Sequence, residues 1–323
     1  PPRSTLFPYT TLFRSRPDGD AIGSAVALGL ALEQAGKKPQ LVFSDGLPKK
    51  FRFLSGSERI RTGIESQYDM VVALDCANFE RLSAPENPEK IHINIDHHVT
   101  NERFAEINFV LPDHAATASI LATYLPAFGY EITPEIANAL LMGMITDTIG
   151  FRTSNVNAEF LRVAAILLEK GADLVQMYQQ GLTLHTGASS KVWGYALSRL
   201  EIDGKLAWTT ILLEDRKRAE YGGMDDADLT NHLSSLENID ISILFNEQKD
   251  DKVKVSWRSS EVFDVTQIAS LFGGGGHPRA AGANMDGALG DVIEKVLGET
   301  KKVMQGKKDR KSTRLNSSHR IRS

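Results

Sequence analysis

The sequence has a single cysteine, Cys76, among 323 residues. One thiol excludes an internal disulfide framework and a structural zinc site built from several cysteines. No apolar run approaches the roughly 20 residues that cross a bilayer, and ALLMGMI (139–145) has the length of a core segment. We therefore expect a protein of the reducing cytoplasm with no membrane partner, although an altered N-terminus leaves room for a lost signal peptide.

The two ends of the chain lack the hydrophobic periodicity of the residues between them. Residues 5–15 (TLFPYTTLFRS) and 309–319 (DRKSTRLNSSH) both resemble translated sequencing-library adapters. We interpret 16–308 as the authentic chain and treat 1–15 and 309–323 as adapter-like artefacts. Excluding them removes seven basic residues and one acidic residue, which leaves 30 basic against 40 acidic residues, a net charge of −10. A chain this acidic is not expected to bind long nucleic acid in general, because such binding depends on neutralising the phosphates.

Short β-rich runs alternate with amphipathic segments up to about residue 185. Strands are expected at 39–45, 69–77 and 91–98, and helices at 21–36, 115–127, 133–147 and 157–170. Strands separated by helices predict an α/β domain, with a parallel sheet flanked by helices, over 16–183. In such sheets functional groups gather beyond the carboxyl ends of the strands.

The pattern changes in the second half of the chain. Residues 199–212 predict a hairpin that turns at Asp203-Gly204. Paired strands are expected at 239–248 and 252–260, and helices at 225–236 and 265–272. These elements predict a smaller α+β domain over 197–308, joined to the first domain by a linker at 184–196.

Acidic and histidine side chains stand at four points of the first domain: Asp18 and Asp20, Asp75, Asp96-His97-His98, and Asp147. An isolated Asp at a turn is more often a helix cap than a ligand. Two adjacent histidines at the end of a parallel strand, in contrast, have little packing rationale. Carboxylates with one imidazole suit Mn²⁺ or Mg²⁺ better than structural zinc, and two such ions about 4 Å apart can clamp a phosphoryl group.

Four motifs resemble the metal motifs of the DHH phosphoesterase superfamily, in the same order: RPDGDAIGS (16–24), VALDCA (72–77), IDHHVTN (95–101) and GMITDTIGF (143–151). VSWRSS (255–260) and DVTQIASLFGGGGHPRAAG (264–282) resemble the DHHA1 type of second domain. The two-domain form is similar to the bifunctional oligoribonuclease and 3′-phosphoadenosine-5′-phosphate (PAP) phosphatases, the nanoRNases. The resemblance covers nearly all of 16–305.

The resemblance implies a role for each residue of the first domain. Asp20, Asp75, His97 and Asp147 would hold one ion, and Asp18 and Asp75 the other, with Asp75 as the bridge. His98 would face the substrate phosphate or the leaving oxygen, and Asp96 would orient its neighbours. Together with Asp75 these two form the expected catalytic set.

The resemblance also implies that the N-terminus is altered. The family has a histidine three residues before Pro17, at the end of the first strand, where this chain has Arg14. A guanidinium cannot ligate a metal, so we expect the recorded chain to be impaired. We also expect its first strand to be missing.

The second domain is expected to recognise the substrate. Its candidate binding residues are Arg258, Ser259, Gly273, Gly274, Gly275, Gly276 and His277. Glycines permit positive φ and would bring backbone N–H groups to a phosphate, and an arginine can clamp one with two hydrogen bonds. Trp257 is the tryptophan placed to stack a base. The family would hold the nucleotide end here, across a cleft from the metals.

The expected activity is Mn²⁺-dependent hydrolysis by two ions, with Mg²⁺ as the alternative metal. Substrates would be short RNA oligonucleotides and nucleoside bisphosphates, and a homodimer is allowed. The related alternative is hydrolysis of pApA, the linear product of cyclic di-AMP breakdown. Two related families fit less well, because family II pyrophosphatases lack the GGGGH loop and RecJ-type exonucleases need further domains.

If Arg14 is natural, a non-catalytic nucleotide-binding protein is the alternative from another class. Cys76 is expected to be a small buried residue.

Overall fold

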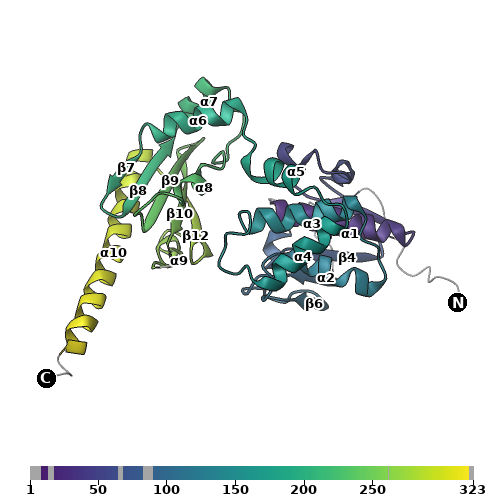
Figure 1. Ribbon diagram of the computed structural model, residues 1–323. Coiled ribbons are helices and arrows are strands. Elements are labelled where there is room, and N and C mark those ends of the chain that lie inside the picture. Colours follow the sequence, from purple (N-terminus) through teal and green to yellow (C-terminus); the bar gives the residue numbers. More distant parts are fainter. Residues whose placement is uncertain (1–8, 14–17, 65–67, 83–89, 261, 320–323) are drawn as a thin grey trace. The chain divides into compact units, whose positions relative to one another are not determined.

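The computed structural model describes residues 9–13, 18–64, 68–82, 90–260 and 262–319. The chain divides into two compact units between Leu184 and His185. Figure 1 shows the elements of the first unit in purple to teal and those of the second in green to yellow. No helix among the described residues is long and apolar enough to cross a membrane.

The first unit is built on a parallel sheet. Its strands lie in the order β3-β2-β1-β4-β5-β6 and pair in parallel throughout. The strands are β1 (Tyr9–Phe13), β2 (Lys38–Val42), β3 (Ile60–Arg61), β4 (Met70–Leu74), β5 (Ile93–Asp96) and β6 (Ile107–Val110). The helices are α1 (Gly19–Gln34), α2 (Thr117–Tyr124), α3 (Pro134–Asp147), α4 (Ala158–Glu169) and α5 (Leu174–Tyr178). This architecture confirms the α/β prediction.

The core of this unit explains why its helices form where they do. Asp18 caps α1 and Thr133 caps α3, each accepting a hydrogen bond from an amide in the first helical turn. Helix α1 is buried along most of its length, and α3 packs against it. Apolar residues of α1, α2 and α3 form one cluster with alternate residues of β2 and β4, including Leu41 and Val72. The remaining strand residues, such as Val71, pack on the other side of the sheet.

A strand occupies the position that we expected to be vacant. The backbone of Tyr9–Phe13 forms β1, which pairs with both β2 and β4 in the middle of the sheet. The expectation that the first strand is missing is therefore wrong for this structure. The segment YTTLF consists of β-branched, aromatic and aliphatic residues that favour strands. A gap between two parallel strands would also leave both their inner rows of N–H and C=O groups unpaired.

The second unit contains a mixed sheet in the order β11-β12-β10-β9-β8-β7, parallel only between β8 and β9. Its strands are β7 (Glu201–Asp203), β8 (Leu206–Ile211), β9 (Ile241–Gln248), β10 (Lys252–Ser259), β11 (Gly275–His277) and β12 (Ala280–Asp286). Its helices are α6 (Gly187–Leu197), α7 (Leu213–Ala219), α8 (Leu229–Leu233), α9 (Thr266–Ser270) and α10 (Leu289–His319). The predicted hairpin is β7–β8, and the smaller α+β domain is confirmed.

Two boundaries differ from the sequence prediction. Most of the expected linker at 184–196 is helix α6, which is capped by Thr186 and buries Val192 and Ala196 against the second unit. Its apolar residues at i and i+4 give this segment a packing face, so it forms a helix. Helix α10 continues without a break to His319, past the expected end of the authentic chain at 308.

Candidate active site

The side chain of Asp75 is held by an unusual backbone conformation at the end of β4. Its φ angle is 53°, in the left-handed region, and its N–H donates to the carbonyl of Ile95 at 2.9 Å. Asp tolerates this region better than most residues, and such conformations gather at functional sites because the surrounding fold must maintain them. The residue is 1% exposed, and Oδ1 accepts a hydrogen bond of 3.3 Å from Thr117 Oγ1.

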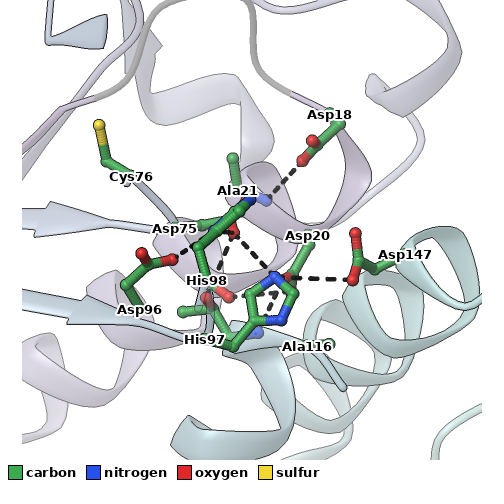
Figure 2. A network of polar contacts seen from close by, with 12 residues as sticks. Asp18, Asp20, Ala21, Asp75, Cys76, Asp96, His97, His98, Ala116 and Asp147 are labelled. Carbon is green, nitrogen blue, oxygen red and sulfur yellow. Dashed lines mark hydrogen bonds and ion pairs between the residues drawn. The ribbon is translucent and has the colours of Figure 1, made fainter. Parts of the chain in front are cut away.

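His97 lies among the carboxylates. Its Nε2 is 3.5 Å from Asp75 Oδ1 and 3.6 Å from Asp147 Oδ2. Dashed lines mark both contacts in Figure 2. This nitrogen is buried and has no hydrogen-bond partner among the described residues. An unpartnered buried polar atom is costly, so its position calls for a ligand that the protein itself does not supply.

Asp20 is held by the N-terminus of α2. Its Oδ2 accepts the N–H of Thr117 at 2.7 Å, and its Oδ1 accepts the N–H of Ala118 at 2.9 Å. The residue before this helix is Ala116, whose side chain cannot cap, so the free amides bind the carboxylate instead. Burial raises the pKa of Asp20, and the nearby Asp18 raises it further, while His97 and the two amides oppose the rise.

A glycine allows the helices to approach closely around Asp20. A Cβ built on Gly143 of α3 would lie 2.7 Å from Asp20 Oδ1 and 2.6 Å from the Cβ of Ala118. Both distances are shorter than any normal contact. Gly143 therefore lets α3 lie against the carboxylate at the point where α1 and α2 meet.

His98 and Asp96 form a hydrogen-bonded pair. Asp96 is fully buried, and its Oδ1 lies 2.7 Å from His98 Nδ1. Burial alone would raise the pKa of Asp96, but hydrogen bonds from His98 and Asn101 and the nearby ring of His97 hold it below its usual value. An ionised carboxylate can only accept, so Nδ1 of His98 carries a proton and donates it to Asp96.

The donor set fits a hard divalent cation. Ligand atoms of Asp20, His97 and Asp147 all lie within 4.8 Å of one another, and so do those of Asp75, Asp96, His97 and His98. An ion bound at about 2.1 Å holds neighbouring ligand atoms roughly 3 Å apart, close to the separations seen at His97 Nε2. Like charges gathered in this way repel each other strongly without a cation.

One predicted ligand stands apart from these groups. Asp18 is exposed, and its Oδ1 accepts the N–H of Ala21 at 3.1 Å as the cap of α1. Figure 2 shows this carboxylate turned toward the backbone nitrogen of Ala21. Arg14, the residue at the expected histidine position, lies outside the described residues.

Arg258 and Ser259 lie at the end of β10 in the second unit. Arg258 Nη1 donates to the carbonyl of Trp257 at 3.1 Å. Burial lowers the pKa of its guanidinium, and the carboxylate of Asp226 opposes that effect. Ser259 Oγ contacts the carbonyls of Phe263 at 2.7 Å and Pro278 at 3.3 Å, so its hydroxyl proton is used within the fold.

The glycine run is only in part as expected. Gly273 (φ +69°) and Gly276 (φ +143°) adopt the positive φ that was predicted. However, the N–H groups of Gly273 and Gly274 donate to carbonyls of α9, so the expectation that they face a phosphate is wrong. Gly275, Gly276 and His277 form the edge strand β11, and the two glycines are exposed. The side chain of His277 lies outside the described part of the structure.

Two further residues can be placed. Trp257 is fully buried, with Nε1 3.4 Å from Thr300 Oγ1 and its ring stacked on Phe272, so the expectation that it stacks a base is wrong. The spacing of Trp257 in an alternating strand already placed it on the core face of β10. Cys76 is buried, and its Sγ donates to the carbonyl of Asn78 at 3.1 Å, in agreement with the expected small buried residue.

The structure also reveals contributors that the sequence pattern does not mark. The amides of Thr117 and Ala118 bind Asp20, Gly143 makes room for it, and Asn101 donates to Asp96. A helix that starts without a capping side chain was a usable signal for the first two. The contacts of Gly143 and Asn101 come from distant segments, and local pattern could not reveal them.

Residues 11–144 match the DHH family, N-terminal domain, and residues 219–306 match the DHHA1 domain. The chain belongs to the DHH family and is a hydrolytic phosphoesterase. It is 37% identical over 285 residues to the bifunctional oligoribonuclease and PAP phosphatase NrnA of Thermus thermophilus, covering 87% of this chain and 85% of that protein.

Two solved structures share this architecture. That of an exopolyphosphatase-related protein from Bacteroides fragilis has a TM-score of 0.81 and 26% identity, over 92% of this chain and 93% of that one. RecJ from Thermus thermophilus, in complex with Mn²⁺, has a TM-score of 0.51 and 13% identity, over 90% of this chain and 51% of that one, and shows a common fold alone.

Proposed function

We propose that this phosphoesterase uses two divalent ions, Mn²⁺ in the first instance, to degrade short RNA oligonucleotides to mononucleotides and to dephosphorylate PAP. The observation that carries the metal proposal is the buried His97 Nε2, which has no hydrogen-bond partner among the described residues and lies between Asp75 and Asp147. The substrates are proposed from the similarity to NrnA of Thermus thermophilus, a bifunctional oligoribonuclease and PAP phosphatase.

The proposed ligands divide into two sets. Asp20, His97 and Asp147 would hold one ion with Asp75, and Asp75 would share its carboxylate with a second ion beside Asp18. The second set is short of one donor, because Arg14 stands where the family has a histidine. Such ions, when bound, lower the pKa of a water and polarise the phosphoryl group.

The protein's own contribution to the reaction centres on His98. Asp96 holds the Nδ1 proton of His98, so a proton taken up at Nε2 gives an imidazolium that the buried carboxylate stabilises. That imidazolium can donate at Nε2 to a phosphate oxygen or to the leaving oxygen. The orientation of the ring is thereby set before substrate binds.

Recognition of the nucleotide is proposed for the second unit. The guanidinium of Arg258 hydrogen-bonds only one carbonyl among the described residues, which leaves donors for a phosphate. Gly275 and Gly276, which are exposed and lie in the edge strand β11, are proposed to contact the same ligand. We further propose a cytoplasmic enzyme that can form a homodimer.

The test measures hydrolysis of RNA of two to five residues and of PAP, in the presence of Mn²⁺. It compares the chain that has Arg14 with its Arg14→His variant. We expect the variant to be at least tenfold more active, because imidazole can ligate and guanidinium cannot. In that background Asp75→Ala should reduce turnover below detection. Asp69→Ala is the matched control, since Asp69 precedes β4 while Asp75 follows it.

Each outcome has a defined meaning. Equal turnover by the recorded chain and the Arg14→His variant would show that a histidine at position 14 is dispensable. Hydrolysis of pApA with no action on PAP or short RNA would replace the proposed substrates by the cyclic-dinucleotide-linked alternative. Nucleotide binding without turnover by either chain would favour the non-catalytic alternative.

A further inference from the structure

The side-chain amide of Asn101 contacts two separate parts of the site. Its Nδ2 lies 2.5 Å from Asp96 Oδ2 and 3.0 Å from the carbonyl oxygen of Cys76. An amide NH₂ group has two hydrogens, so it can make both bonds at once. Because Cys76 directly follows Asp75, this one group joins the carboxylate at the end of β5 to the turn after β4.

A third contact fixes which way the amide points. Asn101 Oδ1 accepts the backbone N–H of Arg103 at 2.7 Å. A flipped amide would place this oxygen against the Asp96 carboxylate and the Cys76 carbonyl, and would set the NH₂ group against an N–H donor. All three contacts therefore require the same orientation of the Asn101 amide. The shape of an amide alone does not distinguish its oxygen from its nitrogen.

The Asp96 carboxylate is shared between two donors as a result. Oδ2 accepts a hydrogen bond from Asn101 and Oδ1 accepts one from His98. A hydrogen bond at each oxygen fixes the rotation of the carboxylate. Loss of the Asn101 bond would leave a fully buried oxygen unpaired and free the carboxylate to rotate. The ring of His98 would then lose the partner that sets its orientation and its tautomer.

We propose that Asn101 is a positioning residue of this phosphoesterase, which ties the Asp96–His98 pair to the turn that carries Asp75. It acts through these side chains and not on the substrate. The inference rests on the role proposed for His98 in the reaction.

Asn101→Ala in the Arg14→His background tests the proposal by kinetics. We expect kcat to fall about 10- to 100-fold, the range typical of losing a partner that orients site residues, with KM changed by less than about twofold. Asn101→Asp should reduce kcat further, because it puts a carboxylate oxygen against Asp96. If the alanine variant does not fold, Asn101→Ser retains one donor and serves in its place.

A second readout needs neither metal nor substrate. In ¹⁵N NMR spectra of the metal-free protein, assigned with His98→Asn, His98 should show a proton held on Nδ1. Asn101→Ala should shift this ring toward a mixture of tautomers. This measurement tests the positioning role even if the proposed substrates are wrong.

Asn94 supplies a matched control. Its Nδ2 donates to the same Cys76 carbonyl at 3.2 Å, and no contact with Asp96 is recorded for it. Asn94→Ala should therefore leave the His98 tautomer unchanged and alter kcat by less than about threefold. The proposal is overturned if Asn101→Ala keeps the wild-type tautomer, or keeps wild-type kcat, or if Asn94→Ala disturbs His98 to the same degree.

Discussion

The two motif-rich regions of this chain use their backbone amides in opposite ways. In the first unit, the amides at the start of α2 donate to the side chain of Asp20, which lies in the candidate metal site. In the second unit, the amides of Gly273 and Gly274 donate to carbonyls of α9 and so complete the fold. Gly275 and Gly276, which are exposed in the edge strand β11, are the members of the run that we propose contact a ligand.

The difference shows that a motif identifies residues without saying which of their polar groups are available. The capping position before α2 is Ala116, and the absence of a capping oxygen there leaves amides for Asp20. The end of α9 has carbonyls to satisfy, and the glycines that follow it satisfy them. The same chemical group is thus functional in one place and structural in the other.

The largest effect is expected from crowding the contact around Asp20. Gly143→Ala places a methyl group 2.7 Å from Asp20 Oδ1, so it should destabilise the first unit by about 1–3 kcal/mol and reduce Mn²⁺ affinity. Thermal unfolding and calorimetric titration of the metal measure the two effects. Gly194→Ala is the control, because a Cβ there meets nothing within 4 Å and should stabilise helix α6 by up to about 1 kcal/mol. If Gly143→Ala binds Mn²⁺ with wild-type affinity, the prediction that close packing of α3 against Asp20 is needed for metal binding is wrong.

Two adjacent glycines of the second unit, Gly274 and Gly275, allow an amide used within the fold to be compared with one proposed to bind the ligand. A Cβ on Gly274 would lie 2.2 Å from the carbonyl oxygen of Gly282, while one on Gly275 meets nothing within 4 Å. Gly274→Ala should therefore cost about 1–3 kcal/mol of stability. Gly275→Ala should change stability by less than about 0.5 kcal/mol and raise KM for PAP. Unchanged KM in Gly275→Ala would remove this residue from the proposed binding site.

The smallest expected effect is a dependence of metal stabilisation on pH. Because the folded-state pKa of Asp20 is raised above 3.8, the metal-free fold binds this proton more tightly than the unfolded chain. Its contribution to stability is therefore lost as the pH rises through the raised value. A bound cation favours the ionised carboxylate, so the increase in Tm on adding Mn²⁺ should grow over this interval. Melting curves in EDTA and in Mn²⁺ measure it, and an equal increase at every pH would contradict the account.

The alternation of buried runs and amphipathic segments was sufficient to predict the parallel sheet of the first unit and the mixed second unit. Two local predictions failed for an identifiable reason. We expected the first strand to be missing, but residues 9–13 form a strand that pairs with both β2 and β4. We expected a linker at 184–196, but Val192 and Ala196 of this segment find an apolar partner surface. In both cases the decisive contact lies far away in the sequence.

Residue identity and order were enough to predict the class of this protein and its candidate ligands, through the resemblance of four motifs to those of the DHH phosphoesterases. The alternation of strands and helices in addition predicted that Asp75 and His97 meet at one edge of the sheet. Only the tertiary structure decided how each group is used. It turned Asp18 into a helix cap, buried Trp257, and joined Asp96 to Cys76 through Asn101. The physical reason is that hydrogen-bond capacity is finite: whether a donor is free depends on which distant acceptor the fold brings to it.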